Sequence, residues 1–295
     1  MPFITVGKEN SSDIKIHYED HGSGEVLVLI HGYPFSGMAW EKEEARFLAE
    51  GYRVITYDRR GFGLSSKPSV GYDWDTFAQD LDKILTELDL NDVTLVGHSM
   101  GSGEVTRYLG NFGSDRISRA VMISPIPPFL LKTEDNPQGI EEKVFDKFKE
   151  AIVKDRYAFI DTFLDDFYNL GKLMGRPDLS KEKICADFNL AATSSPIAFY
   201  ECVNTWIADF RDDLPKIDIP LLVIQGDADK ILPYEVTGKL LAEKIGAKLK
   251  VIPNGSHGIP WTHAEEISQE ILDFISDTYQ KENLSSYDES VRHVH

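Results

Sequence analysis

The chain has 295 residues, of which 42% are hydrophobic and 27% are charged, a composition typical of a soluble globular protein. Its 31 basic and 49 acidic residues leave a formal net charge of −18, which disfavours binding to nucleic acids and anionic membranes. No apolar run approaches the roughly 20 residues that span a bilayer. The first ten residues lack the basic segment and apolar core of a signal peptide, so we expect a cytoplasmic protein.

The first third of the chain alternates strand-like runs with a helix-like segment. Residues 14–18 alternate apolar and polar side chains, which predicts a strand with one solvated face. Residues 26–30 are all apolar, which suits a strand buried on both faces, and residues 53–57 have a broadly similar character. Residues 74–88 are predicted to form a helix.

Another apolar run, residues 93–96, leads directly into the sequence GHSMG of residues 97–101. A strand that turns abruptly into a helix needs small residues on both sides of the turn, because the two backbones nearly touch. Ser99, at the apex, is then presented to a substrate as in a nucleophile elbow. Glycine-flanked serines also occur in ordinary loops, so the motif gains weight only if catalytic partners follow it.

The strand pattern continues at residues 120–123 and then stops until residue 219. Prolines open and close this interval. Inside it, amphipathic patterns predict helices over residues 140–154, 157–168, 181–192 and 196–210. We therefore expect residues 125–213 to form a helical cap over the carboxyl ends of the sheet. A helical subdomain with only a packing role is the alternative.

A strand predicted at residues 220–224 leads into a loop with two carboxylates, Asp227 and Asp229. An acid just past a core strand is where an orienting partner for a histidine is needed. Either aspartate could serve, although the better role for Asp227 is to hold the loop by bonding backbone N–H groups.

The last predicted strand, residues 249–252, leads into a glycine-flanked loop that carries His257. Helices are predicted over residues 234–245 and 263–279. From residue 281 the chain turns polar, and we expect residues 281–295 to be a mobile tail. The core domain would then comprise residues 1–124 and 214–280, a mainly parallel sheet with helices on both faces.

Ser99, an acid and His257 thus follow three predicted strands in that chain order. A serine hydroxyl becomes a good nucleophile only when a base removes its proton and a third group orients that base. We predict Ser99 as the nucleophile, His257 as the general base and Asp229 as the orienting acid, with Asp227 as the alternative acid.

The other histidines are weaker candidates. His98 neighbours the nucleophile, but adjacent side chains diverge at a tight turn, so we expect it to pack. His263 begins a predicted helix and suits a surface or capping role. His293 and His295 lie in the tail.

Cys185 and Cys202 are the only cysteines, and both fall in predicted helices. We expect two reduced, buried thiols, with a disulfide as the alternative. The spacing of cysteine and histidine matches no metal site, and no metal is predicted.

Acyl transfer also requires N–H donors for the oxyanion of the transition state. One donor is predicted to be the backbone N–H of Met100, at the start of the helix that follows Ser99. The second is expected from the loop after residues 26–30, which reads HGYP over residues 31–34. Tyr33 is the candidate there, because Pro34 has no N–H.

Several segments carry a resemblance: residues 31–34 (HGYP), 57–63 (YDRRGFG), 97–101 (GHSMG), 206–211 (WIADFR), and 257–258 (HG) with 261–263 (WTH). Together they resemble the α/β-hydrolase superfamily, and more closely its cofactor-free haloperoxidase branch of perhydrolases, aryl esterases and a γ-lactamase. The resemblance implies an α/β-hydrolase fold, with a mainly parallel eight-stranded sheet, helices on both faces and a helical cap. Its Gly-x-x-Asp loop selects Asp229, and its oxyanion donors correspond to Tyr33 and Met100. Family members often have phenylalanine where this chain has His98.

The triad and the resemblance predict a cofactor-free serine hydrolase that cleaves small carboxylic esters through an acyl-enzyme. Attack by hydrogen peroxide instead of water would make it a perhydrolase as well. A lactamase, amidase or lactonase is the alternative, and a non-enzymatic ligand receptor is less favoured. Epoxide hydrolases and haloalkane dehalogenases resemble the chain over residues 58–65, but they need a carboxylate where this chain has Ser99. The expected partner is a small ester or amide, and a homo-oligomer is left open.

Pro34 and Trp206 are predicted to contact the substrate. Proline biases the preceding residue toward extended conformations, so we expect Pro34 to fix where the Tyr33 carbonyl points. That carbonyl could accept a hydrogen bond from the distal O–H of attacking hydrogen peroxide, and loop rigidity alone is the alternative role. The aromatic residues expected to line the pocket under the cap are Phe129, Phe163, Tyr168 and Trp206.

Overall fold

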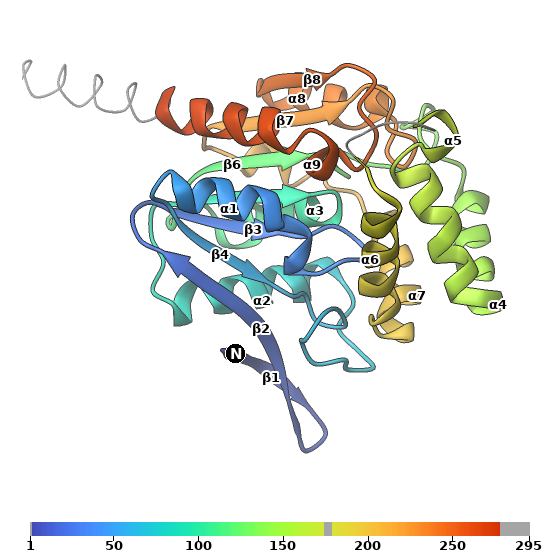
Figure 1. Ribbon diagram of the computed structural model, residues 1–295, viewed down its shortest axis with the longest axis horizontal. Helices are drawn as coiled ribbons and strands as arrows, with labels where there is room; N and C mark the ends of the chain where they lie inside the picture. The colour runs from blue at the N-terminus through green and yellow to red at the C-terminus, as the bar shows by residue number, and fades with distance from the viewer. Residues whose placement is uncertain (1, 174–178, 278–295) are drawn as a thin grey trace, which may run out of the picture.

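An eight-stranded sheet forms the centre of the computed structural model, which describes residues 2–173 and 179–277 (Figure 1). The strand order is β1-β2-β4-β3-β5-β6-β7-β8. β2 pairs antiparallel with both β1 and β4, and every other pair is parallel. The strands are β1 (Phe3–Glu9), β2 (Ser12–Gly22), β3 (Val26–Ile30), β4 (Arg53–Tyr57), β5 (Val93–His98), β6 (Ile117–Ile123), β7 (Leu221–Gly226) and β8 (Lys248–Ile252).

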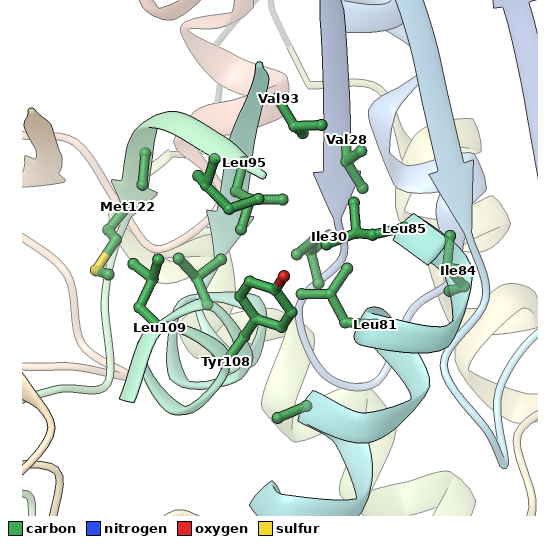
Figure 2. Close-up of a cluster of buried hydrophobic side chains, with 14 of the residues drawn as sticks. Val28, Ile30, Leu81, Ile84, Leu85, Val93, Leu95, Tyr108, Leu109 and Met122 are labelled. Carbon is green, nitrogen blue, oxygen red and sulfur yellow. The ribbon is translucent and has the colours of Figure 1, made fainter. Parts of the chain in front are cut away.

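Helices cover both faces of the sheet, as the continuous apolar strands predict. On β3, Val28 and Ile30 face one core while Leu27 and Leu29 face the other. The first core contains side chains of α2 (Trp74–Glu87), α3 (Met100–Phe112) and α8 (Gly238–Ile245), and Figure 2 shows part of it. The second contains side chains of α1 (Glu41–Ala49) and of a helix over residues 264–277.

In the part of the segment between β6 and β7 that the structure describes, four α-helices gather at one end of the sheet (Figure 1). They are α4 (Glu142–Phe167), α5 (Leu170–Leu173), α6 (Lys181–Ala192) and α7 (Pro196–Thr205). Their buried apolar side chains form a third cluster with Tyr33, Phe35 and Phe62, which belong to loops of the sheet domain. The helical segment therefore packs directly on the loops at that end.

α4 is kinked at Asp155, whose backbone angles are non-helical (φ −161°, ψ 96°). The Asp155 Oδ1 atom accepts hydrogen bonds of 3.0 Å from the backbone N–H groups of Tyr157 and Ala158, as an N-cap residue does. Asp155 thus begins a second helix, which agrees with the two separate helices predicted over residues 140–154 and 157–168.

Several predicted elements differ from the structure. β1 was not predicted, because Ile4 is its only fully buried residue and no apolar run marks it. The single helix predicted over residues 234–245 is interrupted at Thr237, between the 3₁₀ turn η3 (Tyr234–Val236) and α8. The helix predicted to reach residue 210 ends as α7 at Thr205. Residues 278 and 279 of the last predicted helix, and the predicted tail, lie outside the described residues.

Three short elements complete the described fold: η1 (Gly37–Trp40), η2 (Leu214–Lys216) and α9 (Ile259–Thr262). The prediction of two buried thiols is wrong for Cys185, which is exposed on α6, whereas Cys202 is buried on α7. Neither thiol is in a disulfide. Burial raises the pKa of Cys202 to about 12.

Candidate active site

Ser99 lies at the sharp turn between β5 and α3, with φ 53° and ψ −115°. Few non-glycine residues adopt a positive φ. The flanking glycines are required by close packing: a Cβ on Gly97 would lie 2.6 Å from the backbone of Gly101, and one on Gly101 would collide with the carbonyl of Ile30. The motif is therefore a strained strand-to-helix turn, as its sequence predicts.

His257 and Asp229 form a buried pair at the ends of β8 and β7. The His257 Nδ1 atom lies 2.7 Å from Asp229 Oδ2, and both side chains are fully buried. A carboxylate can only accept, so Nδ1 carries the proton and Nε2 is left as a base. Among the described residues, Nε2 has no hydrogen-bond partner. This is the orientation that a general base for a serine requires.

The structure separates the two candidate acids. Asp229 Oδ1 accepts hydrogen bonds of 2.9 Å from the N–H groups of Ile231 and Leu232, which fix the carboxylate beside His257. Asp227 is exposed and instead accepts a 2.6 Å bond from the N–H of Asn254. Only Asp229 is therefore in contact with the histidine.

Gln225, at the end of β7, supports the Asp229 loop and was missed in the sequence. Its Nε2 donates to the Leu232 carbonyl (2.8 Å), and its Oε1 accepts from the Gly238 N–H (2.8 Å). Gln225 is fully buried, so these bonds offset the cost of burying its amide. The sequence signal that could have identified Gln225 is its position as a polar residue at the end of an apolar strand.

His98 and Phe167 pack around His257. Their ring centroids lie 5.0 Å and 5.1 Å from that of His257. The His98 Nε2 atom lies 3.1 Å from the His257 carbonyl, to which it can only donate. Burial holds the pKa of His98 well below its usual value, so the ring is neutral. His98 is thus placed against the histidine loop, which fits the packing role predicted for it.

The HGYP loop lies against the serine turn. A Cβ on Gly32 would lie 2.9 Å from the His98 Nδ1 atom and 3.1 Å from the Ser99 Cβ, so a side chain at this position would press on the serine turn. The Tyr33 hydroxyl donates a 3.0 Å bond to the Phe199 carbonyl of α7, and the Tyr33–Pro34 peptide bond is cis. Met100 is the first residue of α3, so its N–H has no partner within the helix and lies at the positive end of the helix dipole.

A buried network of hydrogen-bonded, charged side chains supports the HGYP loop. The Arg59 guanidinium donates to the His31 carbonyl (3.0 Å) and to Glu104 of α3 (2.7 Å), which also accepts from the Tyr57 hydroxyl. The His31 ring accepts from the Arg59 N–H (2.9 Å), and burial holds its pKa well below the usual value. Sequence reasoning missed this network, although Glu104 is conspicuous among the small residues of its helix.

The cavity that reaches Ser99 measures about 660 Å³, a volume that would hold a drug-sized ligand. Ser99 is 6% exposed. Most of the lining is apolar and comes from α4, and Phe163 and Trp206 contribute to it as predicted. Tyr33, predicted as an oxyanion donor, also lines the cavity. Charged side chains also border it, namely Lys154, Asp155, Asp166 and Lys230.

Three residues predicted near the substrate are not among those that line this cavity: Pro34, Phe129 and Tyr168. The Pro34 carbonyl accepts a 3.1 Å bond from the Ser194 hydroxyl. Phe129 packs under the Arg211 guanidinium, and the Tyr168 hydroxyl donates to Asp187 (2.6 Å). Contact of Pro34 with a substrate stays a prediction.

The remaining histidines lie apart from this site or outside the described residues. His263 is half-buried at the end of α9, with its Nδ1 2.9 Å from the Thr262 hydroxyl. His293 and His295 lie outside the described residues. Within residues 2–173 and 179–277, no group of three His, Cys, Asp or Glu side chains is placed to hold a metal ion. No helix in these ranges is long and apolar enough to cross a bilayer.

Comparison with known families gives a match to the α/β-hydrolase fold over residues 25–264. The chain belongs to this family. A relative from Synechocystis sp., provisionally named a non-heme chloroperoxidase, is 53% identical, and the match covers 93% of this chain and 100% of that protein. A bifunctional esterase/perhydrolase of Acinetobacter calcoaceticus is 34% identical, with 89% and 96% covered. The crystal structure of a bromoperoxidase from Bacillus anthracis matches with a TM-score of 0.89 and 42% identity, over 93% of this chain and 99% of that one.

Proposed function

We propose that this α/β-hydrolase cleaves small carboxylic esters through an acyl-enzyme on Ser99, and that it also acts as a perhydrolase. The observation that carries the proposal is the buried 2.7 Å pair of His257 and Asp229, found together with Ser99 on a strained turn at a mainly apolar cavity. The names of the relatives, an esterase/perhydrolase and a non-heme chloroperoxidase, favour the same chemistry.

In the proposed acylation step, His257 Nε2 takes the proton of Ser99 Oγ as that oxygen attacks the ester carbonyl. Asp229 stabilises the imidazolium that forms. The N–H groups of Tyr33 and Met100 hold the oxyanion, each contributing about 3 kcal/mol to the transition state. The tetrahedral intermediate then collapses, and His257 returns the proton to the departing alcohol.

In the proposed deacylation step, water or hydrogen peroxide attacks the acyl-enzyme while His257 removes a proton from it. Water gives a carboxylic acid, and hydrogen peroxide gives a peracid; Ser99 regains its proton in both cases. Neither route needs a metal or cofactor.

The cavity supports a further part of the proposal, namely that residues 125–213 act as a cap and provide the substrate pocket. Its lining is mainly apolar, and Ser99, Thr162 and the charged side chains that border it are among the polar exceptions. We therefore infer that the substrate bound in this cavity is an ester with an uncharged, apolar acyl group. The core domain of residues 1–124 and 214–280 and a cytoplasmic location stay predictions.

Turnover of p-nitrophenyl acetate tests the proposed function. We expect Ser99→Ala to lose several orders of magnitude in kcat, because the covalent step becomes impossible. The control is the melting temperature of the variant, which should match that of the wild type. Wild-type protein that binds the ester without turnover would instead indicate a receptor, and full activity in Ser99→Ala would refute the nucleophile.

Perhydrolysis is tested at Pro34. We expect Pro34→Leu to lower the ratio of peracid to carboxylic acid formed from the same ester, because the Tyr33 carbonyl loses the orientation that favours hydrogen peroxide. The ratio is measured with both nucleophiles present. An unchanged ratio would leave Pro34 with a purely structural role in its loop.

A further inference from the structure

The C-terminal end of α4 contacts the histidine loop. The Phe167 carbonyl accepts a 2.9 Å hydrogen bond from the Gly258 N–H, next to His257. The Phe167 ring meets the His257 ring edge to face, with centroids 5.1 Å apart and an interplanar angle of 82°. The Tyr168 ring lies so close to Gly258 that a Cβ there would collide with it. Two consecutive residues of the helix end thus fix the loop that carries the proposed base.

Asn169, the next residue, contacts the acid loop instead. Asn169 is 3% exposed, and its Nδ2 donates a 2.8 Å hydrogen bond to the carbonyl of Ala228. That carbonyl belongs to the peptide group that joins Ala228 to Asp229. Asn169 has a φ of 55°, a left-handed conformation that asparagine tolerates better than most residues. The tight turn after α4 therefore aims this amide at the residue before the proposed acid.

The acid loop and the histidine loop are also joined directly by hydrogen bonds. The Ala228 N–H donates to the Gly255 carbonyl (3.1 Å), and Asp227 accepts from the Asn254 N–H (2.6 Å). Those bonds join the two loops, but neither of them involves the Ala228 carbonyl. The Ala228 carbonyl instead accepts its hydrogen bond from the Asn169 side chain.

We propose that Asn169 is a positioning residue, which aligns Asp229 with His257 and couples the wall of the substrate cavity to this pair. The coupling runs along α4, because Phe159, Phe163 and Asp166 line the cavity and the same helix ends in Phe167 and the Tyr168–Asn169 turn. The inference rests on the proposed function of the Asp229–His257 pair.

Two substitutions test the proposal by steady-state kinetics with p-nitrophenyl acetate. Asn169→Asp keeps the shape but places a carboxylate oxygen against the Ala228 carbonyl, and Asn169→Gly keeps the backbone conformation but removes the amide. We expect kcat to fall about 10- to 100-fold in both, because a misplaced catalytic group costs that much. We expect KM to change less than about twofold, since an acetyl group makes few contacts with the cavity wall.

Asn10 provides a matched control, because it also has a positive φ (53°) and is exposed in the turn between β1 and β2. Asn10→Gly should retain the wild-type kcat and KM. The melting temperatures of all variants are compared, so that loss of folded protein is recognised.

A fall in kcat with unchanged KM and melting temperature supports the proposal. Wild-type kcat in both Asn169 variants overturns it, and so does a loss of activity that only follows a loss of folded protein. Ser99→Ala in the same assay separates this inference from the proposed function. If Ser99→Ala is inactive while the Asn169 variants are fully active, only the positioning role of Asn169 fails.

Discussion

Asp227 and Asp229 are separated by one residue, yet their surroundings give them different tasks. Asp229 is buried and receives two backbone N–H bonds as well as the His257 Nδ1–H. Asp227 is exposed and bonds one backbone N–H of the neighbouring loop. Two identical side chains can thus be told apart by how many donors converge on each and how far water is excluded.

This difference leads to a prediction for the two aspartates. We expect Asp229→Asn to lower kcat about 10⁴-fold, because the amide no longer fixes the tautomer of His257. Asp227→Asn keeps an acceptor for the Asn254 N–H and should stay within about threefold of the wild type. Ester hydrolysis by both variants checks this. A larger loss at Asp227 than at Asp229 would reverse the assignment of the acid.

At the scale of elements, the two halves of α4 both line the cavity, and the second also reaches the loops of the proposed acid and base. Its first half, before the kink at Asp155, provides Val144, Phe145 and Phe148 to the cavity. Its second half also lines the cavity and ends at the two loops that carry Asp229 and His257. Trp206, which follows α7, faces the same cavity, with its ring centroid 4.8 Å from Tyr33 and 6.3 Å from Phe148.

Trp206→Ala should therefore shift the preferred acyl length toward longer chains. Each methylene that finds apolar surface contributes about 0.8 kcal/mol, or about fourfold in kcat/KM. The measurement is kcat/KM for p-nitrophenyl esters from acetate to octanoate. Phe112→Ala is the control, because Phe112 is an exposed aromatic at the end of α3. An unchanged chain-length profile would show that Trp206 is only structural.

The elements that could be predicted are those that a short stretch of sequence determines by itself. Residues 26–30 and 53–57 match β3 and β4 to the residue, because each strand is buried on both faces. The serine turn and the order of acid and histidine also follow from short motifs. The break at Thr237 could not be predicted, since it depends on Gln225 accepting the Gly238 N–H. The contact of Asn169 with Ala228 joins residues 59 positions apart, and no local pattern marks it.

For the whole molecule, Glu43 introduces a dependence of stability on pH. It is 1% exposed on α1, and neither carboxyl oxygen has a hydrogen-bond partner on another described residue. Burial raises its pKa from 4.5 to about 8, while Lys42 and Lys183 act in the opposite direction and Glu41 adds to the rise. The folded chain thus keeps a proton on Glu43 that the unfolded chain has released at neutral pH.

Stability should consequently fall as the pH rises from about 4.5 to about 8, by up to about 1.4 kcal/mol per pH unit from this group. The sign follows because the folded state binds more protons than the unfolded state in that window. Glu43→Gln removes the titration. The gap between the free energies of unfolding of the variant and the wild type should therefore shift in favour of the variant as the pH rises. Urea unfolding at several pH values measures the gap. Glu265→Gln, at an exposed position, is the control, and a gap that stays constant with pH would contradict the prediction.

The kink at Asp155 bears on how such an enzyme can acquire new substrates. Residues ahead of the kink line the cavity, whereas the stretch behind it ends in Phe167 and Asn169, which contact the histidine and acid loops. We therefore expect mutations in residues 142–154 to change which esters the cavity accepts while the proposed alignment of Asp229 and His257 is preserved. Selection for a new ester could proceed there in small steps, each leaving an active enzyme.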